Sequence, residues 1–393
     1  MRAQMSRSRS IRRFSLAAAA VAALGLPLAA RPATSIRAAG SGIPIGLVAD
    51  ITGASSVYGI SIRNGAQLAA DAINSKGGVG GQRINLMVGD AASSRTQVVN
   101  LYQQDINSSQ VLALIGPTLS SEATTADPIA QQAGVPVVAT SNTAPGITAI
   151  GPYIFRDSLG EADVIPVTIR TALSHLHFKK VAIIYGNDNA FTQGDGKVFA
   201  AVAQKFGLKV TDTETFATGD KDFSTQLTKI KGSKPDAILV GALAPEAVLI
   251  LTQGRQLGIP TGVHFIGGNG FNSPAVISGA GKAAEGAIEG TAWFANGPSA
   301  LNQSFVKSYK ARYGKAPDQF AAQAYDGVNI LAAAIKGAGT TSDRAKLRNA
   351  LATVKNVPVV TGASGTFAFT ATRDAGEAGT VQIIQNGQFA QYK

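Results

Sequence analysis

Short apolar runs alternate with amphipathic stretches along most of the chain. The first strand-like runs are residues 43–50, 83–90, 111–116 and 135–140. The helical patterns between them cover about 58–75, 94–108 and 120–133. Continuous apolar runs are typical of strands with helices on both faces of the sheet. The alternation therefore predicts an α/β fold with a parallel, doubly wound sheet.

A second series of the same kind follows the segment "YIFRDS". Its strand-like runs are residues 180–186, 208–216, 236–241 and 264–268. Its helical patterns cover about 160–176, 194–206, 222–231 and 245–257. Two similar α/β halves in one chain predict two lobes that face each other across a cleft.

The last hundred residues are mainly helical in pattern. Helices are predicted at 300–313, 319–337 and 343–354, and strands near 365–369 and 380–385. This stretch is too short for a third lobe, so its pieces are expected to complete the first two. Completing both lobes requires the chain to cross between them several times, and such crossings make a hinge.

The first forty residues have the order of a secretory signal. They contain seven arginines and no acidic residue, and the apolar run "SLAAAAVAALGLPLAA" precedes small residues near Ala38. A membrane anchor is the alternative, but about 16 Ala-rich residues are marginal for a ~30 Å hydrocarbon core. Arg12 and Arg13 partly match a twin-arginine signal. We expect export to the periplasm and leave the route and the cleavage site open.

Charge and cysteine content narrow the function classes. The seven arginines account for seven of the net positive charges, so the net charge of the remaining residues is +4 rather than +11. Those residues contain no long basic run. Both facts disfavour nucleic-acid binding. The chain has no cysteine. Disulfides, thiolate metal sites, a cysteine nucleophile and a lipid-modified cysteine are therefore excluded.

The stretch "DITGASSVYG", residues 50–59, has the strand–turn–helix order of a dinucleotide-binding loop. However, Val57 replaces the middle glycine of that fingerprint, where close backbone approach to a pyrophosphate is needed. No tyrosine is followed four residues later by a lysine, as short-chain dehydrogenases require. The known metalloprotease, serine-hydrolase and P-loop motifs are also absent. We predict a protein that is not an enzyme and needs no cofactor or metal.

Hydroxyl groups gather in two loops that follow predicted strands. In "GPTLSSEATT", residues 116–125, Ser120 or Ser121 is placed to cap a helix. The loop "ATSNTAPGIT", residues 139–148, offers Ser141 and Thr143. Ligands of open parallel sheets bind at the carboxyl ends of the strands, and a helix N-terminus favours anions. The two loops suggest a carboxylate cradle, although serine and threonine also cap helices and fill turns.

Several segments resemble periplasmic leucine/isoleucine/valine-type binding proteins, the solute receptors of ABC importers. They are "GIPIGLVADITGASSVYGISIRNGAQLAADAINSKGGVGGQRINLMVGDAAS", "ALIGPTLSSEATTADPIAQQAGVPVVATSNTAP", "VAIIYGNDNAFTQG", "DFSTQLTKIKGSKPDAILVG" and "AYDGVNILAAAI". The resemblance implies a type I periplasmic binding protein with two Rossmann-like lobes and three crossover segments. Its expected bounds are a signal peptide at 1–40, lobe 1 at 41–156 and 292–362, and lobe 2 at 157–291 and 363–393.

The same resemblance implies where a ligand would bind. Ser120 would bond the ligand carboxylate, with further contacts from Ser121, Ser141 and Thr143. Tyr58 would form part of the pocket wall from the first lobe. Phe191 would face the ligand from the second lobe.

One position departs from the family pattern. Amino-acid receptors of this family usually place an acid in the loop after the "FIGG"-like strand, and Asn269 stands there in this chain. An amide cannot neutralise a desolvated ammonium group. Either another acid such as Asp188 supplies the charge, or the ligand lacks an α-ammonium. An aromatic or aliphatic carboxylic acid satisfies the second possibility.

The sequence thus predicts a monomeric periplasmic receptor that captures a small carboxylate by hinge closure and delivers it to a membrane permease. A ligand sensor without a transport role is an alternative that the residues do not separate. A hydrolase or dehydrogenase on an α/β scaffold is a further alternative, which the missing histidine and lysine partners disfavour.

Overall fold

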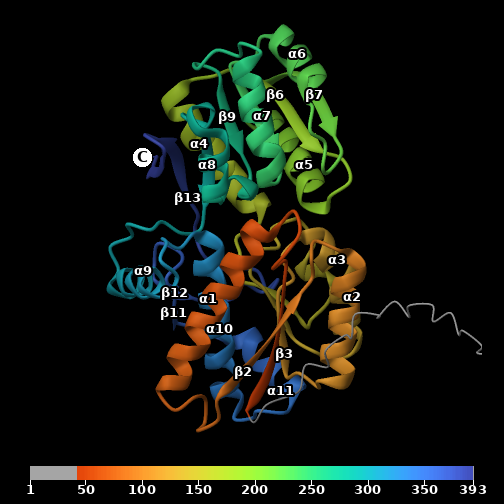
Figure 1. Ribbon diagram of the computed structural model, residues 1–393, viewed down its shortest axis with the longest axis vertical. Helices are drawn as coiled ribbons and strands as arrows, with labels where there is room; N and C mark the ends of the chain where they lie inside the picture. The colour runs from red at the N-terminus through yellow and green to blue at the C-terminus, as the bar shows by residue number, and fades with distance from the viewer. Residues whose placement is uncertain (1–41, 393) are drawn as a thin grey trace, which may run out of the picture. The chain divides into compact units, whose positions relative to one another are not determined.

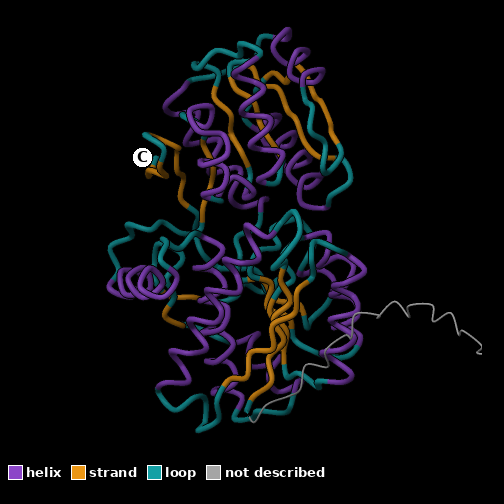
Figure 2. Tube along the Cα trace, viewed as in Figure 1, coloured by secondary structure: helices purple, strands orange, loops and turns teal. Residues whose placement is uncertain are grey.

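The computed structural model describes residues 42–392. Its strands pair into two main sheets and one short two-stranded sheet. The described residues lie within one compact unit. In Figure 2 the strands form two separate groups, each with helices around it. The signal peptide expected over residues 1–40 lies outside the described residues.

The first sheet has five parallel strands in the order β2-β1-β3-β4-β5. The strands are β1 (Ile43–Ala49), β2 (Ile84–Asp90), β3 (Ala113–Ile115), β4 (Val137–Ala139) and β5 (Ile154–Arg156). The helices of this first lobe are α1 (Ser56–Ser75), α2 (Arg95–Gln103), α3 (Ser120–Gln132), α9 (Ala300–Tyr313), α10 (Gln319–Ala338) and α11 (Arg344–Thr353). A π-helical turn, Gln104–Ser108, extends α2.

Alternating side chains of the central strand β1 fill two layers of core. Ile45 and Leu47 pack in the same cluster as α1 and α10, whereas Val48 packs in the cluster on the α2 and α3 side. Figure 1 shows these helix pairs on opposite sides of the sheet. Because successive strand residues point to opposite faces, a run that is apolar throughout requires both layers of helices.

The second sheet has seven strands in the order β14-β13-β10-β9-β8-β6-β7. The strands are β6 (Lys180–Gly186), β7 (Lys209–Phe216), β8 (Ala237–Gly241), β9 (His264–Gly267), β10 (Ile288–Thr291), β13 (Thr380–Gln385) and β14 (Gln388–Gln391). The helices of this second lobe are α4 (Glu161–Leu176), α5 (Ala190–Lys205), α6 (Ser224–Ser233), α7 (Ala244–Gln256) and α8 (Pro274–Ala280). Helices α4 and α5 cover one face, and α6 and α7 cover the other.

The second sheet is mixed rather than purely parallel. β13 pairs antiparallel with both β10 and β14. The sequence pattern did not predict β10, because Glu289 interrupts its apolar run. Glu289 is buried inside the sheet and accepts a hydrogen bond of 2.8 Å from Gln382 Nε2 of β13. A charged residue type in a strand needs such a tertiary partner, which lies far along the chain.

The chain crosses between the lobes after β5, after β10 and before β13. Strands β11 (Val357–Pro358) and β12 (Thr366–Phe367) pair with each other, and residues 368–376 stay beside the first lobe. Arg373 donates to the carbonyl oxygens of Ile154 and Thr148 there, at 3.2 and 2.7 Å. The last crossing therefore falls near residues 376–380, later than the expected boundary at 363.

None of the helices within residues 42–392 combines the length and the apolar character that crossing a membrane requires.

Candidate functional site

A small cavity lies between the two lobes, at the carboxyl ends of strands from both sheets. Its volume is about 20 Å³, room for little more than one water molecule. It is lined by Tyr58, Thr118, Leu119, Ser120, Ser141, Phe191, Leu243, Asn269, Gly270 and Phe320. Five residues expected from the sequence are thus brought together: Tyr58, Ser120, Ser141, Phe191 and Asn269.

Ser120 begins helix α3 at the edge of this cavity. The first N–H groups of a helix have no intrahelical partner and carry positive partial charge. The Ser120 hydroxyl oxygen accepts the backbone N–H of Ala144 at 3.3 Å, which leaves its hydrogen able to donate to a ligand. A hydroxyl and a helix N-terminus therefore meet at one end of the cavity, an arrangement suited to an anion.

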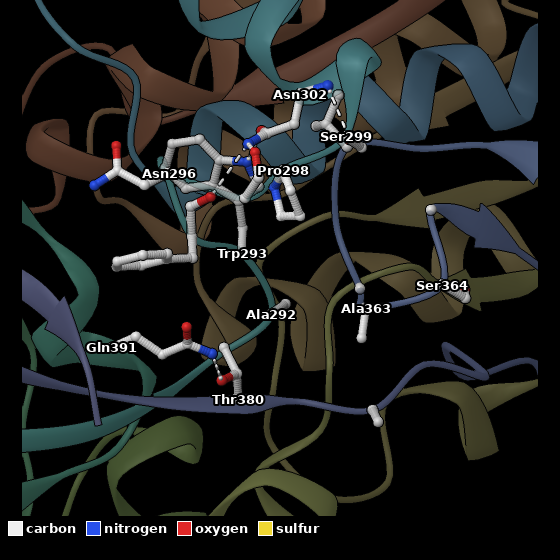
Figure 3. A pocket seen from close by; sticks show the side chains of 16 residues that line it. Ala292, Trp293, Asn296, Pro298, Ser299, Asn302, Ala363, Ser364, Thr380 and Gln391 are labelled. Carbon is white, nitrogen blue, oxygen red and sulfur yellow. Dashed lines mark hydrogen bonds between the residues drawn. The ribbon is translucent and has the colours of Figure 1, made fainter. Parts of the chain in front are cut away.

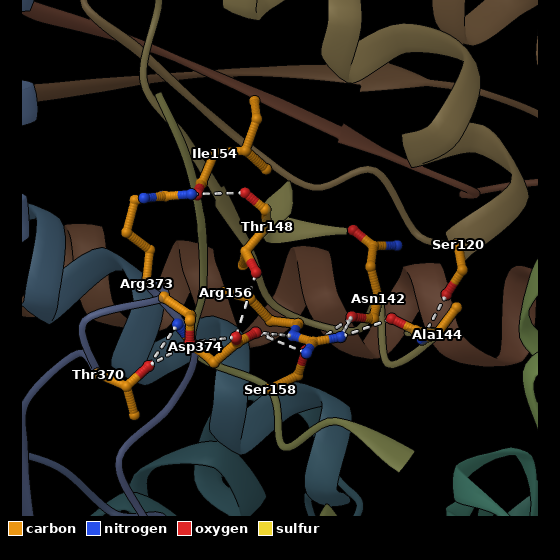
Figure 4. Close-up of polar contacts among 11 residues, drawn as sticks. Ser120, Asn142, Ala144, Thr148, Ile154, Arg156, Ser158, Thr370, Arg373 and Asp374 are labelled. Carbon is orange, nitrogen blue, oxygen red and sulfur yellow. Dashed lines mark hydrogen bonds and ion pairs between the residues drawn. The ribbon is translucent and has the colours of Figure 1, made fainter. Parts of the chain in front are cut away.

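Arg156 holds the loop on which Ala144 lies (Figure 4). Its Nη1 donates to the carbonyl oxygens of Asn142 and Ala144 at 3.1 and 2.8 Å. Its Nη2 pairs with Asp374 Oδ1 at 2.6 Å, and both side chains are largely buried. Because Asp374 neutralises the guanidinium, Arg156 acts on the loop geometry rather than as a charged ligand contact.

Two of the expected hydroxyl groups have already used their hydrogens. Ser141 Oγ donates to the carbonyl oxygen of Thr118 at 2.7 Å, so toward the cavity it can only accept. Thr143 Oγ1 donates to Glu161 Oε1 at 3.0 Å and is not among the cavity-lining residues. Thr143 instead joins the first lobe to helix α4 of the second.

Tyr58 connects the lobes as well as lining the cavity. Its hydroxyl donates to the carbonyl oxygen of Gly270 at 2.9 Å and accepts the N–H of Ala244 at 2.6 Å. Its ring lies 4.6 Å from that of Phe320, centroid to centroid. The hydroxyl is fully used by the second lobe, so only the ring faces a ligand.

The glycines on either side of Tyr58 have structural roles. Gly53 has a φ of +84°, which residues with side chains rarely adopt. A Cβ on Gly59 would lie 2.0 Å from the carbonyl oxygen of Asp50. Gly59 therefore allows α1 to approach the end of β1 closely, a role unrelated to phosphate binding.

Ser121 and Asp188 line a neighbouring cavity of about 180 Å³ that also opens between the lobes. The carboxylate of Asp188 accepts the N–H and the hydroxyl of Thr218 at 3.0 and 2.7 Å. The carbonyl oxygen of Asp188 accepts Arg95 Nη2 of the first lobe at 3.0 Å. The structure therefore does not bring Asp188 to the cavity that Ser120 and Asn269 line.

Sequence reasoning missed the buried acids behind the second-lobe wall. Glu161 is fully buried and accepts the backbone N–H of Asn269 at 3.0 Å. Burial raises the pKa of Glu161 to about 7. Burial, and then the charge of Glu161, raise the pKa of Asp195 well above its usual range.

Several lining residues were also missed. Leu243 follows β8, so the rule that ligands bind at the carboxyl ends of strands could have found it. Phe320 lies in α10, which returns to the first lobe only after two crossings, and no local pattern marks it. Its place depends on the packing of α10 against α1.

A larger cavity of about 310 Å³ lies beside the crossover after β10 (Figure 3). Two pairs of its polar side chains bond to each other: Trp293 Nε1 donates to Asn302 Oδ1 at 2.6 Å, and Gln391 Nε2 donates to Thr380 Oγ1 at 3.4 Å. Asn296, Pro298 and Ser364 on its rim are exposed. We favour the smaller cavity because residues expected from the sequence line it from both lobes, Ser120 from the first and Asn269 from the second among them.

Comparison with known proteins shows the family and the fold of this chain. A sequence profile described as "Periplasmic binding protein" matches residues 42–391. The Leu/Ile/Val-binding protein BraC3 of Rhizobium johnstonii is 30% identical over 324 residues, 81% of this chain and 86% of that protein.

Two solved structures are also similar. The branched-chain amino acid transporter substrate binding protein LivJ of Streptococcus pneumoniae, in complex with isoleucine, is 30% identical with a TM-score of 0.81, covering 88% of this chain and 97% of that one. An ABC transporter solute binding protein of Rhodopseudomonas palustris, in complex with 3,4-dihydroxy benzoic acid, is 25% identical with a TM-score of 0.80, covering 89% and 95%. These likenesses confirm the expected fold.

Proposed function

We propose that this chain, which belongs to the periplasmic binding protein family, captures a small carboxylate in the periplasm and presents it to the permease of an ABC importer. The similar proteins are named as binding proteins and as parts of transporters, which supports the transport role over sensing. The signal-like first forty residues support export.

The uncharged lining of the small cavity is the observation that carries the proposal. None of its ten lining residues is acidic or basic. At one end, Ser120 and the first N–H groups of α3 offer donors to a carboxylate. The rings of Tyr58, Phe191 and Phe320 and two leucines supply an apolar surface for the rest of the ligand.

The ligand class follows from what this lining lacks. A buried ammonium group without an anionic partner is costly, and the lining offers none. We therefore propose an aromatic or aliphatic carboxylic acid without an α-ammonium. A branched-chain amino acid is the second candidate, favoured by the names of relatives and by Glu161, which contacts the backbone of Asn269.

Ligand entry requires the lobes to move apart. Pockets for small molecules have volumes of about 300–1,000 Å³, far above the 20 Å³ of this cavity. The three crossovers supply the hinge. Opening would separate Tyr58 from Gly270 and Ala244, and closure would then bring the two walls against the ligand.

Calorimetric titration of the purified mature protein tests the ligand class. Leucine and 4-methylpentanoate differ only by the α-ammonium, as do phenylalanine and 3-phenylpropanoate, and benzoate adds a shorter aromatic acid. We expect the acid of each pair to bind at least about tenfold more tightly than its amino acid. Binding confined to the α-amino acids would contradict the proposed class and support the second candidate.

A further inference from the structure

The side-chain amide of Gln319, the first residue of α10, is held in one orientation. Its Oε1 accepts the backbone N–H of Ala292 at 2.6 Å and also the hydroxyl of Thr291. A backbone N–H can only donate, so the atom beside Ala292 must be the oxygen of the amide. Gln319 is buried, and its NH₂ group is consequently directed to the other side.

That NH₂ group donates to Asn269 Oδ1. A second donor reaches the same oxygen, since Asn272 Nδ2 lies 3.4 Å from it. The orientation of Asn272 is fixed in turn, because its Nδ2 also donates to the carbonyl oxygen of Gly290 at 2.8 Å. Two independently oriented amides therefore fix the atom of Asn269 that they contact as its oxygen.

The NH₂ group of Asn269 is left for the cavity. Asn269 lines the cavity together with Ser120, and within residues 42–392 no acceptor is recorded for its Nδ2. The second-lobe wall thus presents a hydrogen-bond donor. A carboxylate or carbonyl oxygen can accept from it, whereas an ammonium group, which has only donors, cannot.

We propose that Gln319 is a specificity-determining positioning residue, which turns the donor of Asn269 toward the cavity and so selects a ligand oxygen and rejects an α-ammonium. This inference rests on the proposed function. It adds that the selection is imposed from α10, a first-lobe helix, on a second-lobe side chain.

The substitution Gln319→Glu tests the orientation directly. An ionised glutamate at this position, measured at pH 9, can still accept from Ala292 and Thr291, but its other oxygen has no hydrogen to give to Asn269. Asn269 then turns its NH₂ group toward the glutamate and its oxygen toward the cavity. We expect the affinity of leucine relative to 4-methylpentanoate to rise at least about tenfold.

The new charge of the glutamate could favour an ammonium without any rotation of Asn269, so a second background separates the two effects. In Asn269→Ala protein, we expect Gln319→Glu to leave the ratio of the two affinities unchanged. If the ratio shifts equally in both backgrounds, or in neither, Gln319 does not act through Asn269 and the inference is wrong.

A neutral variant and the wild-type protein complete the design. Gln319→Met removes the orienting hydrogen bonds without adding charge, and we expect a shift of the same sign but smaller, about threefold. Equal losses for both ligands would indicate a purely structural role and overturn the inference. If wild-type protein binds neither ligand of either pair and does not bind benzoate, the proposed function fails and the inference with it. If the acids bind normally but the affinity of leucine relative to 4-methylpentanoate is unchanged in every variant, the inference is wrong and the proposed function stands.

Discussion

The two walls of the small cavity are built differently. On the first-lobe wall, Thr118, Ser120 and Ser141 are each bonded within their own lobe, and Thr118 Oγ1 accepts the N–H of Asp50 at 2.9 Å. On the second-lobe wall, Asn269 depends on Gln319 of α10 for its orientation. The first wall is therefore complete before closure, whereas the second is completed only when the lobes meet.

The same contrast holds for the buried acids behind the walls. Glu122 lies behind the first wall, and burial and then the charge of Asp50 raise its pKa to about 8. A protonated Glu122 keeps negative charge away from the N-terminus of α3, where a carboxylate would bind. Behind the second wall, Glu161 bonds both Thr143 of the first lobe and Asn269 of the second. Its role thus involves contact between the lobes.

The largest expected effect comes from breaking the first wall with Ser120→Ala. A hydrogen bond to a charged group contributes about 1.5–3 kcal/mol, so the affinity for the best carboxylate should fall roughly tenfold to hundredfold, as measured by calorimetry. Ser121→Ala is the matched control, because Ser121 lines the neighbouring cavity. We expect less than about a threefold change there. Equal effects of the two substitutions would contradict the proposed carboxylate position.

A smaller loss of affinity is expected from Tyr58→Phe, which tests how much closure of the lobes contributes to binding. The variant keeps the ring but removes both hydrogen bonds to the second lobe. We expect affinity to fall about fivefold to tenfold. Small-angle scattering with saturating ligand should also show a larger open fraction.

Tyr102→Phe provides the control for that loss. Tyr102 donates to Asp127 at 3.0 Å within the first lobe and is equally buried. This variant should lower thermal stability without changing affinity. If it weakens binding as much as Tyr58→Phe does, the contacts of Tyr58 across the lobes are not what matters.

The smallest expected effect concerns stability and pH. The pKa of Glu122 is raised from 4.5 to about 8 by burial, so the native state binds a proton that the unfolded state loses. Stability from this group is fully present below pH 4.5 and is lost as pH rises toward 8. Burial raises the pKa values of Glu289 and Glu377 in the same direction, also to about 8.

We therefore expect the melting temperature to fall by about 5 °C between pH 5 and pH 8. Glu122→Gln should make the melting temperature depend less steeply on pH. The part of the dependence that comes from Glu289 and Glu377 should remain. Differential scanning calorimetry measures both. The same dependence of melting temperature on pH in Glu122→Gln and wild-type protein would show that Glu122 is ionised in the native protein.

The local sequence pattern predicted most of the helices and strands correctly, but it misplaced several of their ends. β6 and α9 have the predicted bounds, since each has a clear period and its own turn signals. Helix α5 begins at Ala190, four residues before the prediction, because Asn189 caps it by accepting the N–H of Phe191 at 2.9 Å. Gly194 and Gly196 are unfavourable helix residues by their type. In the structure they allow Pro145 and Tyr185 to pack closely against this helix.

What the sequence determined by itself is the order of strands and helices, the two α/β series and the hydroxyl loops at strand ends. These depend on hydrophobic period and local turn chemistry, which neighbouring residues specify. Only the tertiary structure decided which hydroxyl hydrogens are free, which acids are buried and which way Asn269 faces. Each of those depends on partners from distant segments, as Gln319 and Ala292 show for Asn269, and hydrogen-bond direction is a property of the assembled network.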